Sequence, residues 1–168
     1  KQSANDMVNH ALASFGRVDG LVNNAAIDPK FETDLAEQHA STFENYPLEL
    51  WNRSLAVNLT GMFLCAQAVA PPMLDQGRGV IVNISSTYGL VGPDQRLYER
   101  GDAHSPRVFK PVDYSVTKSA VLGLTRYLAA YWADAGIRVN TLTPGGVFNY
   151  HEEEFIRRYS SRTMLGRM

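Results

Sequence analysis

Three short apolar runs divide the chain, at residues 17–26, 79–86 and 136–146. Each run is rich in β-branched residues and has no polar alternation at its centre. This pattern is typical of strands that are covered on both faces, as in a parallel sheet.

Segments with helical periodicity separate these runs. In 48–74, apolar side chains recur at steps of three and four residues and form one helix face. They are Leu55, Leu59, Met62, Ala66, Val69 and Met73. We expect Pro71 and Pro72 to bend or end this helix.

A second helix is predicted at 113–135, with an apolar face made by Val116, Ala120, Leu124, Leu128 and Tyr131. Asp113 is placed to cap its start and Gly136 to cap its end. The opening segment 2–15 is a third helix, ended by Gly16.

The order helix, strand, helix, strand, helix, strand predicts an α/β fold with right-handed crossovers. In such sheets ligands bind beyond the carboxyl ends of the strands. Those ends read "NNAA" (23–26), "SSTYG" (85–89) and "TPGG" (143–146). They are small, polar or glycine-containing, so backbone can approach a ligand closely. We therefore expect one binding site at this edge.

Composition narrows the class of protein. The 168 residues include 16 basic and 17 acidic side chains, and the net charge of -1 gives no indication of a nucleic-acid or membrane-surface partner. No unbroken apolar run approaches the ~20 residues of a membrane span. The single cysteine, Cys65, excludes an intramolecular disulfide, and we expect a cytoplasmic protein. The chain opens inside a helical pattern without a methionine, so we expect a piece of a longer protein.

Three candidate chemistries lack their required companions. Ser115 and Lys118 form S-x-x-K, but the S-D-N and K-T-G elements of serine acyl-transfer enzymes do not occur. The four histidines are scattered, and "HEEEF" at 151–155 is not H-E-x-x-H, so no metal site is predicted. "GRG" at 77–79 precedes a strand and cannot be a phosphate-binding fingerprint.

Tyr114 and Lys118 form Y-x-x-x-K and lie on one face of the predicted helix. A free phenol has a pKa near ~10, and a nearby ammonium lowers that value by favouring the phenolate. Such a pair suits proton transfer to or from an alcohol oxygen while hydride is exchanged with a nicotinamide. Ser86, at the end of the second strand, is placed to hold that oxygen.

These residues, with four further motifs, resemble the short-chain dehydrogenase/reductase family. "NNAA" is similar to the family's N-N-A-G, with Ala26 in place of glycine. "VNLTG" (57–61) resembles the helix with the family's catalytic Asn. "IVNISSTYG" (81–89) resembles the strand that ends in its catalytic Ser. "RVNTLTPGGV" (138–147) resembles the sixth strand and its Pro-Gly turn. The resemblance covers nearly the whole chain and implies a Rossmann-like, doubly wound parallel sheet, present only in its C-terminal portion.

The resemblance implies a role for each matching residue. Tyr114 would be the acid/base, and Lys118 would lower its pKa and bind the nicotinamide ribose. Ser86 would bind the substrate oxygen, and the main chain of Asn58 would hold a water of the proton relay. The implied cofactor is NAD or NADP, contacted also by Asn23, Ala25, Pro144, Gly145 and Val147.

The chain departs from the family's pattern in three ways. The first strand and the glycine-rich loop precede residue 1, so we expect the chain alone to be inactive, and NAD cannot be told from NADP. The turn "PGGVFN" lacks the threonine that holds the carboxamide in many members, and Asn149 is the candidate replacement. Ser86 and Tyr114 are separated by an inserted loop at about 93–111.

The inserted loop has two interpretations. One is a solvated surface loop. The other is a substrate lid, in which Arg96 or Arg107 meets a phosphate or carboxylate. The stretch "SSTYGLVGPDQRLYE" is also similar to bacterial members in surface-sugar and nonulosonate pathways, which implies a phosphorylated or nucleotide-linked sugar as substrate.

The sequence therefore predicts one partial Rossmann-type oxidoreductase domain, 1–168, that interconverts a small-molecule alcohol and carbonyl. The family implies a homodimer or homotetramer through helices 48–74 and 113–135. Two other classes stay open: a non-catalytic relative that binds or assembles, and a serine acyl-transfer enzyme that uses Ser115 and Lys118.

Overall fold

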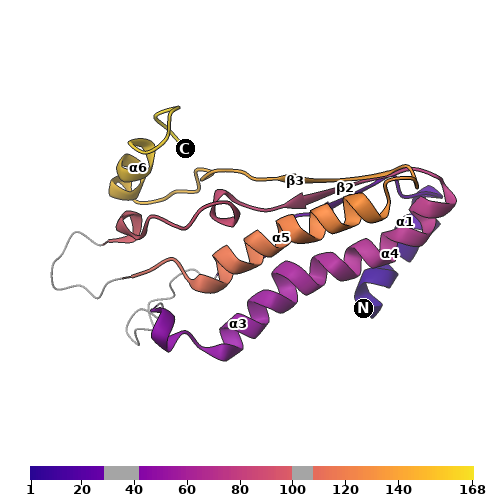
Figure 1. Ribbon diagram of the computed structural model, residues 1–168, viewed down its shortest axis with the longest axis horizontal. Helices are drawn as coiled ribbons and strands as arrows, with labels where there is room; N and C mark the ends of the chain where they lie inside the picture. The colour runs from indigo at the N-terminus through magenta and orange to yellow at the C-terminus, as the bar shows by residue number, and fades with distance from the viewer. Residues whose placement is uncertain (29–41, 100–107) are drawn as a thin grey trace.

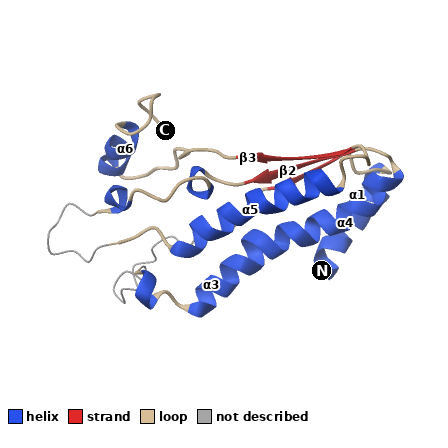
Figure 2. Cartoon of the chain, viewed as in Figure 1, coloured by secondary structure: helices blue, strands red, loops and turns tan. Residues whose placement is uncertain are grey.

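The computed structural model describes residues 1–28, 42–99 and 108–168 and confirms an α/β chain with a parallel sheet (Figures 1 and 2). The helices are α1 (Gln2–Phe15), α3 (Leu48–Leu55), α4 (Gly61–Asp75), α5 (Val112–Tyr131) and α6 (Glu153–Ser160), and the strands are β1 (Gly20–Asn23), β2 (Gly79–Ile84) and β3 (Ile137–Leu142). Short helical turns are η1 (Phe43–Asn45), η2 (Ala56–Thr60), η3 (Thr87–Gly89) and η4 (Gln95–Tyr98).

The three strands form one parallel sheet in the order β1-β2-β3. Gly20 pairs with Val80 and Gly79 with Ile137, and the register continues to the strand ends. All three carboxyl ends therefore meet at one edge, as the sequence predicts.

Helices α4 and α5 cover one face of the sheet, and α1 packs on α4 (Figure 1). The core between them consists of Val8, Ala66, Val69, Met73, Ile81, Leu128, Trp132, Ile137 and Val139. On the other face Val22 is 63% exposed, and β3 alternates between buried and exposed positions. The expectation of strands covered on both faces is therefore wrong for residues 1–28, 42–99 and 108–168, because α4 and α5 cover the same face of the sheet and Val22 on the other face is exposed.

The predicted helix 48–74 is one helical segment made of α3, the single π-helical turn η2 and α4. Pro71 and Pro72 lie inside α4 and do not end it. Met73 behind them is fully buried, and this packing offsets the backbone hydrogen bonds that prolines cannot make.

The segment Leu48–Asp75 is also long and apolar enough to cross a membrane, by length and composition only, with a hydropathy of 1.3 over its most apolar window. Core helices meet the same criterion. Met62, Ala66 and Val69 of this segment are buried inside the fold, while 28% of the most apolar window is buried in total.

Two predictions about the ends of α5 are wrong. Asp113 does not cap the helix; its carboxylate is fully buried and accepts a hydrogen bond from the Ser54 hydroxyl. Gly136 has a φ of 70° but lies beyond the helix, in the turn before β3. A β-carbon there would lie 2.1 Å from the carbonyl oxygen of Gly77, so the turn requires glycine.

The predicted apolar face of α5 is also partly wrong. Val116 and Tyr131 are 40% and 68% exposed, whereas Thr117, Lys118 and Thr125 are buried. Polar side chains can be buried when hydrogen bonds satisfy them. The inner face of α5 is therefore partly a polar face that reaches the carboxyl edge of the sheet.

Candidate active site

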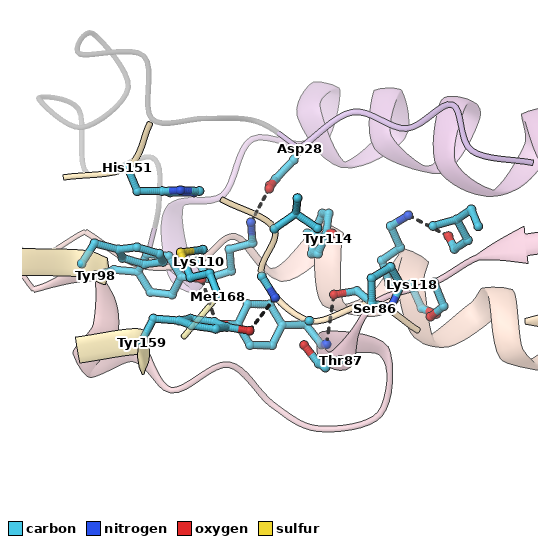
Figure 3. Close-up of a pocket in the computed structure, with 18 of the residues that line it drawn as sticks. Asp28, Ser86, Thr87, Tyr98, Lys110, Tyr114, Lys118, His151, Tyr159 and Met168 are labelled. Carbon is cyan, nitrogen blue, oxygen red and sulfur yellow. Dashed lines mark hydrogen bonds and ion pairs between the residues drawn. The ribbon is translucent and has the colours of Figure 1, made fainter. Parts of the chain in front are cut away.

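A cavity of about 360 Å³ lies beyond the carboxyl ends of the three strands (Figure 3). Its lining comes from the segments after β1, β2 and β3, from the first turns of α5, from η4 and from α6. This volume is typical of small-molecule sites.

Ser86 lines this cavity because the turn after β2 is fixed against α5. The hydroxyl of Ser85 donates to the main-chain oxygen of Lys118 (2.7 Å), and the hydroxyl of Ser119 donates to the oxygen of Gly89 (3.0 Å). A β-carbon on Gly89 would lie 2.5 Å from Ser85 Oγ and 2.6 Å from the Lys118 oxygen. This close approach requires glycine and sets Ser86 beside α5.

Tyr114 and Lys118 lie one turn apart on α5 and both line the cavity. Lys118 Nζ donates to the main-chain oxygen of Ile84 (2.8 Å) and lies 5.7 Å from the centroid of the Tyr114 ring. Ser115 does not line this cavity, and within the described residues its buried hydroxyl has no hydrogen-bond partner. The ammonium thus shares a cavity with Tyr114 and not with Ser115.

The pKa shift of Tyr114 differs from the one expected from the sequence, and the pKa of Lys118 is shifted as well. Burial raises the pKa of the Tyr114 phenol, a hydrogen-bonding interaction with Ser86 opposes the rise, and the Asp28 carboxylate adds to it. Burial also lowers the pKa of Lys118, and Asp28 partly offsets this change. The expected lowering of the phenol pKa is therefore wrong for this structure, because burial is the largest influence and raises the pKa, and the opposing influence comes from Ser86 rather than from Lys118.

Asn58 lies in the π-helical turn η2 and is fully buried. Its Oδ1 accepts from the N–H of Ile27 (2.8 Å), and its Nδ2 donates to the Ile27 oxygen (2.9 Å) and to Thr117 Oγ1 (3.2 Å). Such π-helical turns are frequent at functional sites. The Asn58 side chain therefore joins the segment after β1 to α5.

Only some of the residues expected to contact the cofactor line the cavity. Pro144, Gly145 and Val147 line the cavity. Asn23 is buried and donates to Asn83 Oδ1 (2.8 Å), while Ala25 is exposed and lies outside the lining.

Asn149, the candidate for the carboxamide, is likewise exposed and outside the lining. Its main-chain N–H donates to Nδ1 of His151 (3.2 Å). This placement does not support the predicted contact of its side chain.

The inserted loop brings a lysine, and not Arg96, into the cavity. Arg96 is 73% exposed and pairs with Asp94 through two contacts of 2.8 and 2.9 Å. Arg107 lies outside the described residues. Lys110, at the end of the loop, lines the cavity; its ammonium pairs with Asp28 and lies 4.1 Å from the centroid of the Tyr114 ring.

Sequence reasoning missed the wall formed by α6 and the residues before it. His151, Phe155 and Tyr159 line the cavity, with ring centroids 5.0 and 6.1 Å apart along the stack. The Tyr159 hydroxyl accepts a hydrogen bond from the N–H of Gly146. The spacing of four residues in "HEEEFIRRY" was the only signal in the sequence, and it does not show what the aromatic face contacts.

The inserted loop is attached to α6 by arginines. Arg158 donates to the main-chain oxygens of Arg96 (3.2 Å) and Glu99 (2.7 Å), and Arg162 donates to Asp94 Oδ2 (2.8 Å). This part of the loop is therefore packed as a wall of the site, against the interpretation of a solvated surface loop.

Two tyrosines complete the wall beside Tyr114. The hydroxyls of Tyr88 and Tyr98 are hydrogen-bonded at 2.9 Å, and burial raises the pKa of both phenols. They stay neutral at physiological pH and present hydroxyl groups to the cavity.

Across residues 1–28, 42–99 and 108–168, no three His, Cys, Asp or Glu side chains are grouped in a way that could hold a metal ion. The acid and base groups of the cavity are instead Asp28, Lys110, Tyr114, Lys118 and His151, together with neutral tyrosines.

Comparison with known protein families gives two matches. The family described as short chain dehydrogenase matches residues 1–98, and the family described as Enoyl-(Acyl carrier protein) reductase matches residues 104–167. Together they cover nearly the whole chain.

Similar proteins extend this result. An uncharacterized oxidoreductase from Thermotoga maritima is 34% identical over 99% of this chain and 61% of its own length. A short chain dehydrogenase from Leptospira borgpetersenii with bound NAD+ has a TM-score of 0.80 and 32% identity, over 97% of this chain and 57% of its own. A gluconate 5-dehydrogenase from Burkholderia cenocepacia, in complex with NADP and tartrate, has a TM-score of 0.75 and 29% identity, over 98% and 57%. The chain thus spans about three fifths of the length of these relatives.

Proposed function

The chain belongs to the short-chain dehydrogenase family, and on that premise we propose that its full-length protein is an NAD- or NADP-dependent oxidoreductase that interconverts an alcohol and a carbonyl. The observation that carries the proposal is the shared cavity of Ser86, Tyr114 and Lys118 at the carboxyl edge of the parallel sheet.

The cavity fits a nicotinamide and a small substrate. The turn Pro144–Val147 provides a backbone edge, and Lys118 provides a cation in the same cavity. These residues would hold the ring and its ribose, with Asn23 and Ala25 at the neighbouring strand end. When bound, the nicotinamide supplies the hydride acceptor or donor.

The proton chemistry belongs to residues of this chain. During alcohol oxidation the Tyr114 phenolate accepts the hydroxyl proton, and Ser86 donates a hydrogen bond to the substrate oxygen. During carbonyl reduction Tyr114 returns the proton to that oxygen. Lys118 stabilises the phenolate, and the main chain of Asn58 supports the water that exchanges the proton with solvent.

We propose a phosphorylated or nucleotide-linked sugar as the substrate class. The cavity combines the hydroxyls of Tyr88 and Tyr98 with the aromatic face of Phe155, which suits a molecule with hydroxyl groups and an apolar ring face. Among the described residues of the inserted loop, Lys110 is the cation that lines the cavity, and we assign the phosphate contact to it. Arg96 pairs with Asp94 outside the cavity lining and does not make a phosphate contact in this conformation.

The partners of the full-length protein are also proposals. An apolar strip on α4 and α5 is exposed: Phe63 is 44%, Tyr127 64% and Tyr131 68% exposed. We propose that this strip packs against a second copy of the chain, in a homodimer or homotetramer. The free Cys65 agrees with a cytoplasmic location.

The assay is the absorbance change of reduced nicotinamide with the full-length protein and a panel of alcohols and sugar phosphates. We expect Tyr114→Phe to abolish turnover and Ser115→Ala to preserve most of it. Loss of turnover in Ser115→Ala, with Tyr114→Phe still active, would overturn the assignment of Tyr114 as the acid/base. Cofactor binding without any turnover would favour a non-catalytic relative.

A further inference from the structure

Lys110 is held in the site from three sides. Its main-chain N–H donates to Gln95 Oε1 of η4 (2.8 Å), and its ammonium pairs with Asp28 in the segment after β1. The same ammonium lies 4.1 Å from the centroid of the Tyr114 ring (Figure 3). The Lys110 side chain is only 11% exposed, so this arrangement is packed rather than solvated.

We propose that the Lys110–Asp28 ion pair modulates the acidity of the Tyr114 phenol, with Lys110 as a positioning residue that acts through the face of the ring. The inference rests on the proposed function only in that Tyr114 is the acid/base. It adds a second cation, from the inserted loop, to the lysine one turn along α5.

The physical basis is the charge that a phenolate spreads into its ring. A cation over the ring face attracts that charge and favours ionisation. Lys118 lies farther from the ring centroid, at 5.7 Å, and donates to the Ile84 carbonyl. Lys110 is therefore the nearer of the two cations.

Asp28 acts in the opposite direction. Its carboxylate raises the pKa of Tyr114 and limits the fall in the pKa of Lys118 that burial causes. It also pairs with Lys110, so the effects of the two opposite charges on the Tyr114 pKa partly cancel. Removing either partner exposes Tyr114 to the full effect of the other.

The remaining groups that line the cavity around Tyr114 include hydroxyls and one imidazole. Ser86, Tyr88, Tyr98 and Tyr159 present neutral hydroxyls, and His151 lies farther along the wall, stacked on an aromatic ring. Among the described groups, the ion pair and Lys118 therefore dominate the local field.

The test is a titration of the Tyr114 phenol in the full-length protein, without cofactor or substrate. Tyrosines are replaced by 3-fluorotyrosine, which ionises at lower pH, and the fluorine resonance of Tyr114 is assigned by its loss in Tyr114→Phe. We expect the midpoint to rise in Lys110→Met and to fall in Asp28→Asn, each by about one pH unit, as charge pairs at this distance predict. Lys110→Arg should restore the wild-type midpoint.

The control is Arg17→Met, which breaks the exposed Arg17–Asp19 pair far from the cavity and should not move the midpoint. Unchanged midpoints in both Lys110→Met and Asp28→Asn, or shifts of the same sign, would overturn the proposal. If Lys110→Met fails to fold by circular dichroism, Asp28→Asn alone decides, since only a fall supports the pairing. The titration does not depend on turnover. If the nicotinamide assay finds no activity but the two variants shift the midpoint in opposite directions, the proposed function is refuted and this inference stands.

Discussion

Replacing Gly89 by alanine is expected to destabilise the protein and to displace Ser86 from Tyr114. The β-carbon would lie 2.5 Å from Ser85 Oγ and 2.6 Å from the main-chain oxygen of Lys118. The second of these atoms belongs to the backbone of α5, which cannot rotate away as a side chain can. The turn after β2 must therefore move as a unit.

The cost follows from two contributions. Overpacking a closely packed position costs about 1–3 kcal/mol. The 2.7 Å hydrogen bond from Ser85 to the Lys118 oxygen is lost as well, at about 1 kcal/mol. We therefore expect the free energy of unfolding to fall by about 2–4 kcal/mol.

The measurement is urea unfolding followed by circular dichroism, with the midpoints compared at equal slope. Gly92→Ala is the matched control, because a β-carbon at Gly92 has no atom within 4 Å and its φ is not positive. If Gly89→Ala and Gly92→Ala unfold at the same urea concentration, the turn is not packed on α5 as described, and the positioning of Ser86 needs another explanation.

Two further predictions concern buried and exposed polar groups. Asn83→Ala should destabilise by about 2–4 kcal/mol, because it removes two buried hydrogen bonds and takes away the acceptor of the buried Asn23 amide; Asn140→Ala, at an exposed position of β3, should be nearly neutral in the same unfolding assay. Neighbouring arginines lower the pKa of Glu154 from 4.5 to about 2, so its stabilisation of α6 is present above pH 4.5 and is lost as the pH falls toward about 2. Wild type and Glu154→Gln should differ slightly in the amide exchange of α6 at pH 6 and converge near pH 2, and a difference that grows in acid would contradict this assignment.

Local pattern was sufficient to predict the elements and the edge that carries the site. Short β-branched runs report strands, and parallel strands bring their carboxyl ends to one edge, so the segments after β1, β2 and β3 were expected together. Tyr114 and Lys118 are four residues apart on a helix, and such a pair shares a face regardless of the rest of the fold.

Hydrophobic periodicity failed where the buried face is polar. It placed Val116 and Tyr131 inward, whereas the structure buries Thr117 and Thr125, whose hydroxyls have hydrogen-bond partners. A periodicity of apolar residues identifies which side chains avoid water. It does not identify polar ones that a neighbouring element satisfies.

Local sequence was therefore enough to predict the three strands, the helices at 2–15, 48–74 and 113–135 and the Tyr114–Lys118 pair, because each depends on residues close together in the chain. Only the tertiary structure decided what surrounds that pair. Asp28 and Lys110 are 82 positions apart, and the aromatic wall begins at His151, 41 positions after Lys110. No local propensity connects such residues; they meet because the parallel crossovers and the packing of the inserted loop on α6 return them to one edge of the sheet.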